Sequence, residues 1–250
     1  TCALPICLTG NDEAAMPIDS ILTALQGGLI VSCQAPATSP LHQPEMIAAM
    51  AEAAVLQGAV GVRIDSPAHI AAVRQRVSVP IIGLWKQVIA GSDVYITPQY
   101  GHAEAVALAG ADIIAIDATL RPRPEDETLA SLIERIRTDL KKPVMADIDT
   151  VTSATAAVTA GAELLGTTLY GYTSATAALK PPGFDLLTDL VKRFPTPCLC
   201  EGGIASPAAA RQAIALGSHA VVVGTAITGI DLLVQQYCQS LSTVAFPTNQ

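Results

Sequence analysis

The chain has 250 residues, of which 50% are hydrophobic, 14% charged and 4% aromatic, and its formal net charge is −8. This acidic balance argues against a nucleic-acid-binding protein, which needs a basic patch. Three of the six cysteines fall in apolar, strand-like runs, which favours buried thiols in a reducing, cytoplasmic compartment, and the apolar N-terminal run is too short for a signal peptide or a membrane span.

Eight short apolar runs alternate with Ala-rich stretches of helical spacing. The runs span residues 28–34, 59–64, 80–85, 112–117, 143–147, 164–168, 197–201 and 220–224. The helical stretches span residues 44–57, 67–77, 100–109, 128–140, 152–160, 184–194 and 207–216. Most runs are continuously apolar, as expected for parallel strands buried on both faces. The pattern predicts an α/β fold, a single (β/α)8 TIM barrel over residues 21–250 behind an N-terminal extension of residues 1–20.

Two further features bear on this assignment. A ninth β-like run at residues 94–97 closely follows the third strand, and we expect it in the third βα loop rather than in the barrel. The alternative is a doubly wound open sheet, which would normally show fewer units. No Gly-x-Gly-x-x-Gly segment follows the first run, so the sequence favours the barrel.

Charged residues end five of the predicted strands. They are Arg63, Lys86, Asp117, Asp147 and Glu201, and Gln34 ends the first strand. Because a TIM barrel carries its chemistry at the C-terminal ends of the strands, these side chains should meet at one mouth. Two interpretations of Arg63 are open: it neutralises a bound phosphate, or it pairs with Asp147 or Glu201.

Glycines also mark the ends of the last two predicted strands. Gly202 and Gly203 come after the seventh, and Gly224 with Thr225 comes after the eighth. This is the usual phosphate position in the fold, because glycine lets backbone N–H groups approach the phosphate oxygens. Simple tight turns are the other interpretation.

Lys86 and Glu201 are the pair that the sequence indicates for proton transfer. Removing a proton next to a carbonyl needs a base tuned towards neutral pH, and desolvation can lower the pKa of a lysine. Lys86 as a Schiff-base nucleophile is the competing catalytic hypothesis. The four histidines form no metal-binding pattern, so we predict no metal site.

Several ordered motifs resemble those of the N-acetylmannosamine-6-phosphate 2-epimerases. The resemblance covers most of the chain and includes the segments that span residues 28–34, 80–86, 95–98, 111–119, 121–124, 166–173 and 201–202. It implies a cytoplasmic TIM-barrel isomerase of amino-sugar and sialic acid breakdown that needs no metal or organic cofactor. It also implies a phosphorylated amino sugar as substrate, no nucleic acid or membrane partner, and a homodimer.

The resemblance also implies roles for individual residues. Lys86 and Glu201 match the catalytic pair of the family. The positions expected to contact the sugar are Gln34, Arg63, Asp147, Thr168 and Tyr172, and those expected to hold the phosphate are Gly202, Gly203, Gly224 and Thr225.

The chain departs from the family pattern at three places. Gly203 stands where the family has an arginine after the seventh strand, Tyr170 replaces a serine, and Ile148-Asp149 replaces smaller residues. The first departure removes a cation from the expected phosphate site. It motivates one rival hypothesis, a barrel that binds a sugar phosphate without catalysis. The other rival is a phosphosugar lyase that uses Lys86 as an imine.

Overall fold

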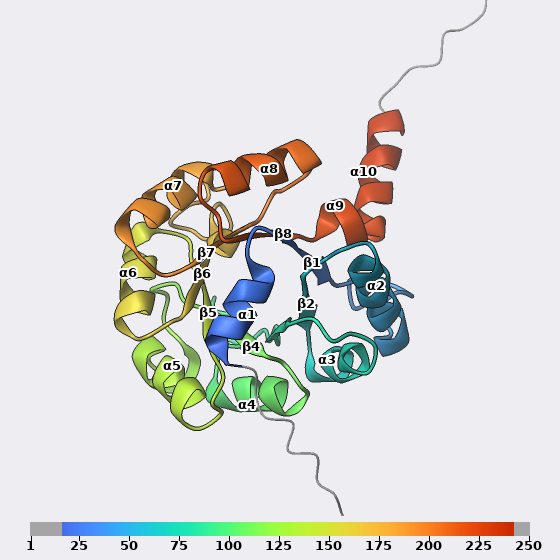
Figure 1. The fold of residues 1–250 in the computed structure, drawn as a ribbon. Coiled ribbons are helices and arrows are strands. Elements are labelled where there is room, and N and C mark those ends of the chain that lie inside the picture. The colour runs from blue at the N-terminus through green and yellow to red at the C-terminus, as the bar shows by residue number, and fades with distance from the viewer. Residues whose placement is uncertain (1–16, 243–250) are drawn as a thin grey trace, which may run out of the picture.

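A closed barrel of eight parallel strands forms the centre of the protein (Figure 1). The computed structural model describes residues 17–242. Each strand pairs with the next along the chain, and the last pairs with the first. The strands are β1 Leu29–Cys33, β2 Gly61–Asp65, β3 Ile81–Leu84, β4 Ile113–Asp117, β5 Val144–Asp147, β6 Leu164–Gly166, β7 Cys198–Glu201 and β8 Ala220–Val223. The predicted TIM barrel is confirmed.

Helices surround the barrel and alternate with the strands, as predicted. They are α2 Pro44–Leu56, α3 Pro67–Arg74, α4 Tyr100–Leu108, α5 Leu129–Thr138, α6 Val151–Thr159, α7 Phe184–Arg193 and α8 Pro207–Ala215. Short 3-10 turns, Pro124–Asp126 and Thr167–Leu169, follow β4 and β6. The side chains of Thr128, Thr150 and Ser206 cap α5, α6 and α8 by accepting a backbone N–H, which explains why these helices begin where they do.

Two buried apolar layers hold the barrel together. Side chains alternate between the two faces of each strand, so one set fills the barrel interior and the other packs under the helices. The interior layer includes Ile82, Met145 and Leu199. Helix α1, Ile18–Leu25, closes the N-terminal end of the barrel by adding Ile21 and Leu25 to this layer.

The N-terminal boundary and the cysteines can now be placed. The expected boundary after residue 20 falls inside α1, and residues 1–16 of the predicted extension lie outside the described residues. Cys33, Cys198 and Cys200 are free and buried, in agreement with the prediction, whereas Cys238 is exposed. Burial raises the pKa of the Cys198 thiol to about 12.

The run at residues 94–97 lies in the loop after β3, as expected. Ile96 forms an antiparallel bridge with Lys86, and the backbone N–H groups of Gln87 and Thr97 donate to the carbonyl oxygens of Tyr95 and Trp85, both at 2.9 Å. The chain after β3 is therefore a short two-stranded ribbon that extends beyond the barrel.

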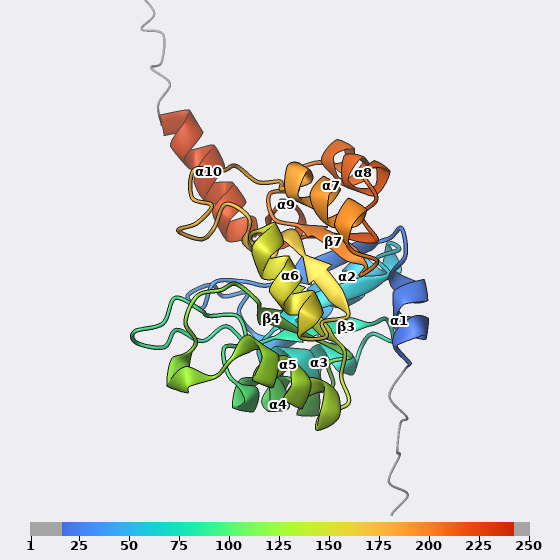
Figure 2. The ribbon, with the colours of Figure 1, turned by 90° about the vertical axis from the view of Figure 1, so that its left-hand side faces the viewer.

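Two helices for which the sequence analysis made no prediction follow β8. Helix α9, Thr225–Thr228, is one turn long, and α10, Ile230–Ser242, points away from the barrel (Figures 1 and 2). No residue of α10 is buried. Within residues 17–242, no helix is both long enough and apolar enough to span a membrane.

Candidate active site

Arg63, Asp147 and Glu201 form a buried ion-pair cluster at the C-terminal end of the barrel. The two Nη atoms of Arg63 donate to the Oδ atoms of Asp147 at 3.0 and 2.6 Å, and Nη1 also donates to Glu201 Oε2 at 2.7 Å. Arg63 is 1% exposed. Of the two interpretations of Arg63, the geometry favours pairing with the carboxylates, because the guanidinium is already engaged on two sides.

The predicted end of the second strand was wrong by two residues. Strand β2 continues through Ile64 to Asp65, so Arg63 lies within the strand and points into the barrel. A charged residue inside a buried strand is tolerated here because two carboxylates from β5 and β7 neutralise it.

Glu201 has an environment suited to proton exchange near neutral pH. Burial raises the pKa of this carboxyl, Arg63 opposes the shift and the charge of Asp147 adds to it, so that the resulting pKa is about 7. Thr168 lies next to this cluster and donates its hydroxyl to Asp147 Oδ1 at 2.5 Å. Asp147 itself is completely buried and reaches the cavity only through these partners.

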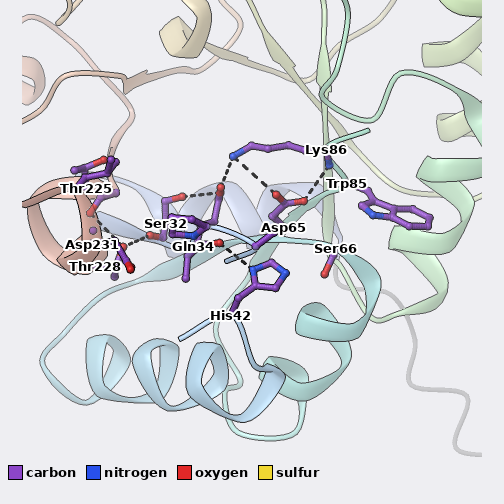
Figure 3. A pocket seen from close by; sticks show the side chains of 16 residues that line it. Ser32, Gln34, His42, Asp65, Ser66, Trp85, Lys86, Thr225, Thr228 and Asp231 are labelled. Carbon is purple, nitrogen blue, oxygen red and sulfur yellow. Dashed lines mark hydrogen bonds and ion pairs between the residues drawn. The ribbon is translucent and has the colours of Figure 1, made fainter. Parts of the chain in front are cut away.

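Lys86 lies directly beyond β3, on the side of the barrel opposite Glu201, since β3 and β7 are four strands apart in a closed ring of eight. Its Nζ donates to Gln34 Oε1 and lies 3.9 Å from Asp65 Oδ2 (Figure 3). Desolvation lowers the pKa of Lys86, and the nearby Asp65 charge opposes that shift. Gln34 is itself held by Ser32, whose Oγ accepts its Nε2 at 3.0 Å.

Two adjoining hollows open at this mouth. The larger, about 710 Å³, is lined by every predicted site residue except Asp147. The smaller, about 590 Å³, shares Ser32, Gln34, Lys86, Gly224 and Thr225 with it (Figure 3). Residues that are dispersed over most of the sequence therefore meet at one cavity, while their individual roles stay predictions.

The backbone strongly favours glycine at position 203. Its φ is +70°, and a Cβ there would lie 2.6 Å from the Cβ of Pro181, so a larger residue would need the loop before α7 to move. Two arginines after β4 that could replace the missing cation are engaged elsewhere: Arg121 pairs with Asp117 at 2.6 Å, and Arg123 donates to the Asp117 carbonyl. Lys180, beside Pro181, is exposed.

The lining residues that sequence reasoning missed include Ser32, Asp65 and Tyr95. Tyr95 begins one of the motifs quoted above, and burial raises the pKa of its phenol. Asp65 follows Arg63 by two residues, so it would have been found had β2 been extended. No group of three or more His, Cys, Asp or Glu side chains in residues 17–242 has an arrangement suited to a metal ion.

Comparison with known proteins gives a consistent result. Residues 47–243 match the family described as "NanE: Putative N-acetylmannosamine-6-phosphate epimerase". Two relatives called "Putative N-acetylmannosamine-6-phosphate 2-epimerase" are those of Synechococcus elongatus, 62% identical over 88% of this chain and 96% of the relative, and Thermosynechococcus vestitus, 63% identical over 89% and 96%. The solved N-acetylmannosamine-6-phosphate 2-epimerase from Clostridium perfringens superimposes with a TM-score of 0.84 at 34% identity, covering 88% of this chain and 96% of that one.

Proposed function

Since the chain belongs to the N-acetylmannosamine-6-phosphate epimerase family, we propose that it is an isomerase that interconverts N-acetylmannosamine-6-phosphate and N-acetylglucosamine-6-phosphate by proton transfer at C2. The observation that supports this most directly is the pair of titratable groups across the cavity. Lys86, with a lowered pKa, and Glu201, with a raised pKa, come from opposite sides of the barrel.

Epimerisation needs two groups that reach opposite faces of one carbon. In the open-chain sugar, one group removes the C2 proton, and the electrons of that bond move towards the C1 carbonyl oxygen. The other group then delivers a proton to the opposite face of C2, which restores the carbonyl with inverted configuration. Lys86 and Glu201 suit these roles because both pKa values shift towards neutrality, where a group can both accept and release a proton.

The rest of the cavity suits a sugar phosphate. Backbone N–H groups near Gly202, Gly203, Gly224 and Thr225 would hold the phosphate. The side chains of Gln34, Thr168 and Tyr172 would orient the hydroxyl and acetamido groups. Arg63 and Asp147 act on the substrate through Glu201 and Thr168, because their mutual ion pair leaves them little exposed surface.

Proton NMR of N-acetylmannosamine-6-phosphate with the protein in D₂O, without added metal, tests the reaction. We expect the anomeric signal of N-acetylglucosamine-6-phosphate to appear with deuterium at C2. Lys86→Met should abolish turnover, whereas Lys192→Met, a change at an exposed lysine of α7, should not. Full turnover by Lys86→Met would refute the assignment. A substrate adduct at Lys86 trapped by borohydride would instead support the Schiff-base lyase.

We also propose that the protein is a homodimer in which α10 packs against a second copy. Apolar side chains along this helix are 46–72% exposed: Leu232, Val234, Tyr237 and Leu241. An apolar hollow of about 550 Å³ also lies open between α2 and the start of α10. Exposed apolar surface of this kind marks interfaces. Light scattering should give a dimer for the natural chain and a monomer for Val234→Asp; a natural chain that is monomeric at micromolar concentration would refute the proposal.

We also propose a cytoplasmic location, which the same chemistry supports. The buried cysteines carry free thiols, which persist in reducing compartments, and a sugar phosphate is retained inside cells by its charge. Cell fractionation with an antibody to the protein tests this, and recovery in an extracellular or envelope fraction would contradict it.

A further inference from the structure

Asp65 lies at the end of β2 and contacts both the backbone N–H and the side-chain amine of Lys86. Its Oδ1 accepts the backbone N–H of Lys86 at 2.9 Å, and its Oδ2 lies 3.9 Å from Nζ (Figure 3). Among the described residues, both polar contacts of the Asp65 carboxylate are to Lys86. The β2–β3 register, which pairs Asp65 with Leu84, brings the carboxylate to this position.

The main chain of Lys86 is therefore held from two directions. On one side is the Asp65 carboxylate, and on the other is the ribbon formed with Ile96. Beyond the main chain, Nζ donates to the amide oxygen of Gln34. With both the backbone and the amine restrained, the lysine has little freedom to leave the cavity.

Four charged groups face Lys86 from the strands around it. Arg63 and Asp65 come from β2, Asp147 from β5 and Glu201 from β7. Asp147 and Glu201 are both bonded to Arg63, so their charges are largely compensated. Asp65 does not pair with Arg63, and among the described residues its ion pair is with Lys86 Nζ. Its charge therefore acts on Lys86 most directly.

We propose that Asp65 is a positioning residue for Lys86, which fixes the lysine main chain at the barrel mouth and stabilises the ammonium form of its side chain. The catalytic consequence rests on the proposed epimerase function, whereas the effect on the lysine does not. Asp65 thus sets both the place of the amine and the pH range over which it gains and loses a proton.

Two substitutions separate these effects. Asp65→Asn keeps an oxygen that can accept the Lys86 N–H but removes the charge, and Asp65→Ala removes both. Asp112→Asn is the matched control, because Asp112 Oδ2 accepts the N–H of Ile81 at 2.8 Å, at the opposite end of the same strand. It therefore alters a similar carboxylate-to-backbone bond far from the cavity.

The first measurement needs no substrate. Competitive labelling of amines with a trace acylating reagent, read by mass spectrometry across a pH series, gives the pKa of Lys86 with the exposed Lys180 as internal reference. Loss of a negative charge makes the ammonium less stable, so both Asp65 variants should lower the Lys86 pKa by about half to one unit. Asp112→Asn should leave it unchanged.

The second measurement is the pH profile of kcat/KM for the epimerisation. In Asp65→Asn the limb that reports Lys86 should move to lower pH by the same amount, with maximal turnover within a few-fold of the natural chain. Asp65→Ala should also lose about 10- to 100-fold in kcat, because the amine is no longer held in place. Unchanged labelling in both Asp65 variants would overturn the proposal. Shifted labelling without any epimerisation would instead count against the proposed function alone.

Discussion

Replacing Arg63 by methionine removes the one cation that neutralises two buried carboxylates. The three hydrogen bonds of its guanidinium, at 2.6–3.0 Å, would be lost, and Asp147 and Glu201 would be left close together with side-chain exposures of 0% and 13%. Breaking a buried ion pair by removing one partner typically costs about 3–5 kcal/mol, because the remaining charge stays buried without compensation. We expect a loss of this size for Arg63→Met at pH 8.

The loss should depend on pH in a defined direction. The pKa of Glu201 already lies above its ordinary value, at about 7, and removing Arg63 will raise it further. A carboxyl whose pKa is raised on folding destabilises the folded state only where it must ionise. The penalty is therefore small below about pH 4.5, the ordinary range of glutamate, and is complete above the raised folded pKa. The destabilisation should be clearly smaller at pH 5 than at pH 8.

Equilibrium urea unfolding at pH 5 and pH 8 measures both quantities. Arg76→Met is the matched control, since Arg76 pairs with Glu52 at 3.3 Å with both side chains more than a third exposed, and such a pair contributes about 0–1 kcal/mol. In the double variant Arg63→Met, Glu201→Gln, the loss should be less than the sum of the two single losses. A loss for Arg63→Met that equals the Arg76 control at pH 8 would refute this account of the cluster.

Two further predictions concern the edges of the cavity. Thr168→Val removes the 2.5 Å bond to buried Asp147 and should cost about 1.5–3 kcal/mol by urea unfolding, with a lower kcat; an unchanged midpoint would contradict it. Gly203→Ala places a Cβ 2.6 Å from Pro181 at a φ of +70° and should cost about 1–3 kcal/mol and raise KM. Gly101→Ala, in α4 with open space around it, should instead stabilise the fold by about 0.5–1 kcal/mol. This control tests whether the loss at Gly203 comes from its own backbone conformation and neighbours and not from replacing a glycine as such.

The barrel could be predicted because its evidence is local. Each strand is a short apolar run and each helix has a recurring apolar face, so eight alternating units can be counted without knowing any contact between them. Helix α10 was not predicted, and, like the one-turn helix α9, it has no buried residue. Within residues 17–242 none of its apolar side chains is buried, so the fold of these residues alone does not explain why they are apolar.

The meeting of the candidate residues at one mouth could be predicted because strand ends converge in this fold, but the ion pairs across the barrel could not be predicted. Arg63 looked like a strand end, because a lone charge rarely lies inside a buried strand. Its partners are 84 and 138 residues away, a separation at which no local pattern indicates contact. Missing those partners moved the end of β2 by two residues and concealed Asp65.

The charges of the larger hollow favour a phosphate held mainly by backbone groups. In the described part of the chain this hollow is lined by two cations, Arg63 and Lys86, and one carboxylate, Glu201. Arg63 is committed to carboxylates, and Lys86 contacts Gln34 and Asp65. At position 203, where the family pattern has an arginine, the positive φ and the closeness of Pro181 disfavour any side chain. Oriented N–H groups around Gly203 and Gly224 can still bind an anion, since they supply fixed partial charges without a mobile side chain. An acidic protein with a net charge of −8 can thus accommodate the proposed sugar phosphate while Lys86, the one amine among the described residues that line this hollow, stays available for the proposed proton transfer.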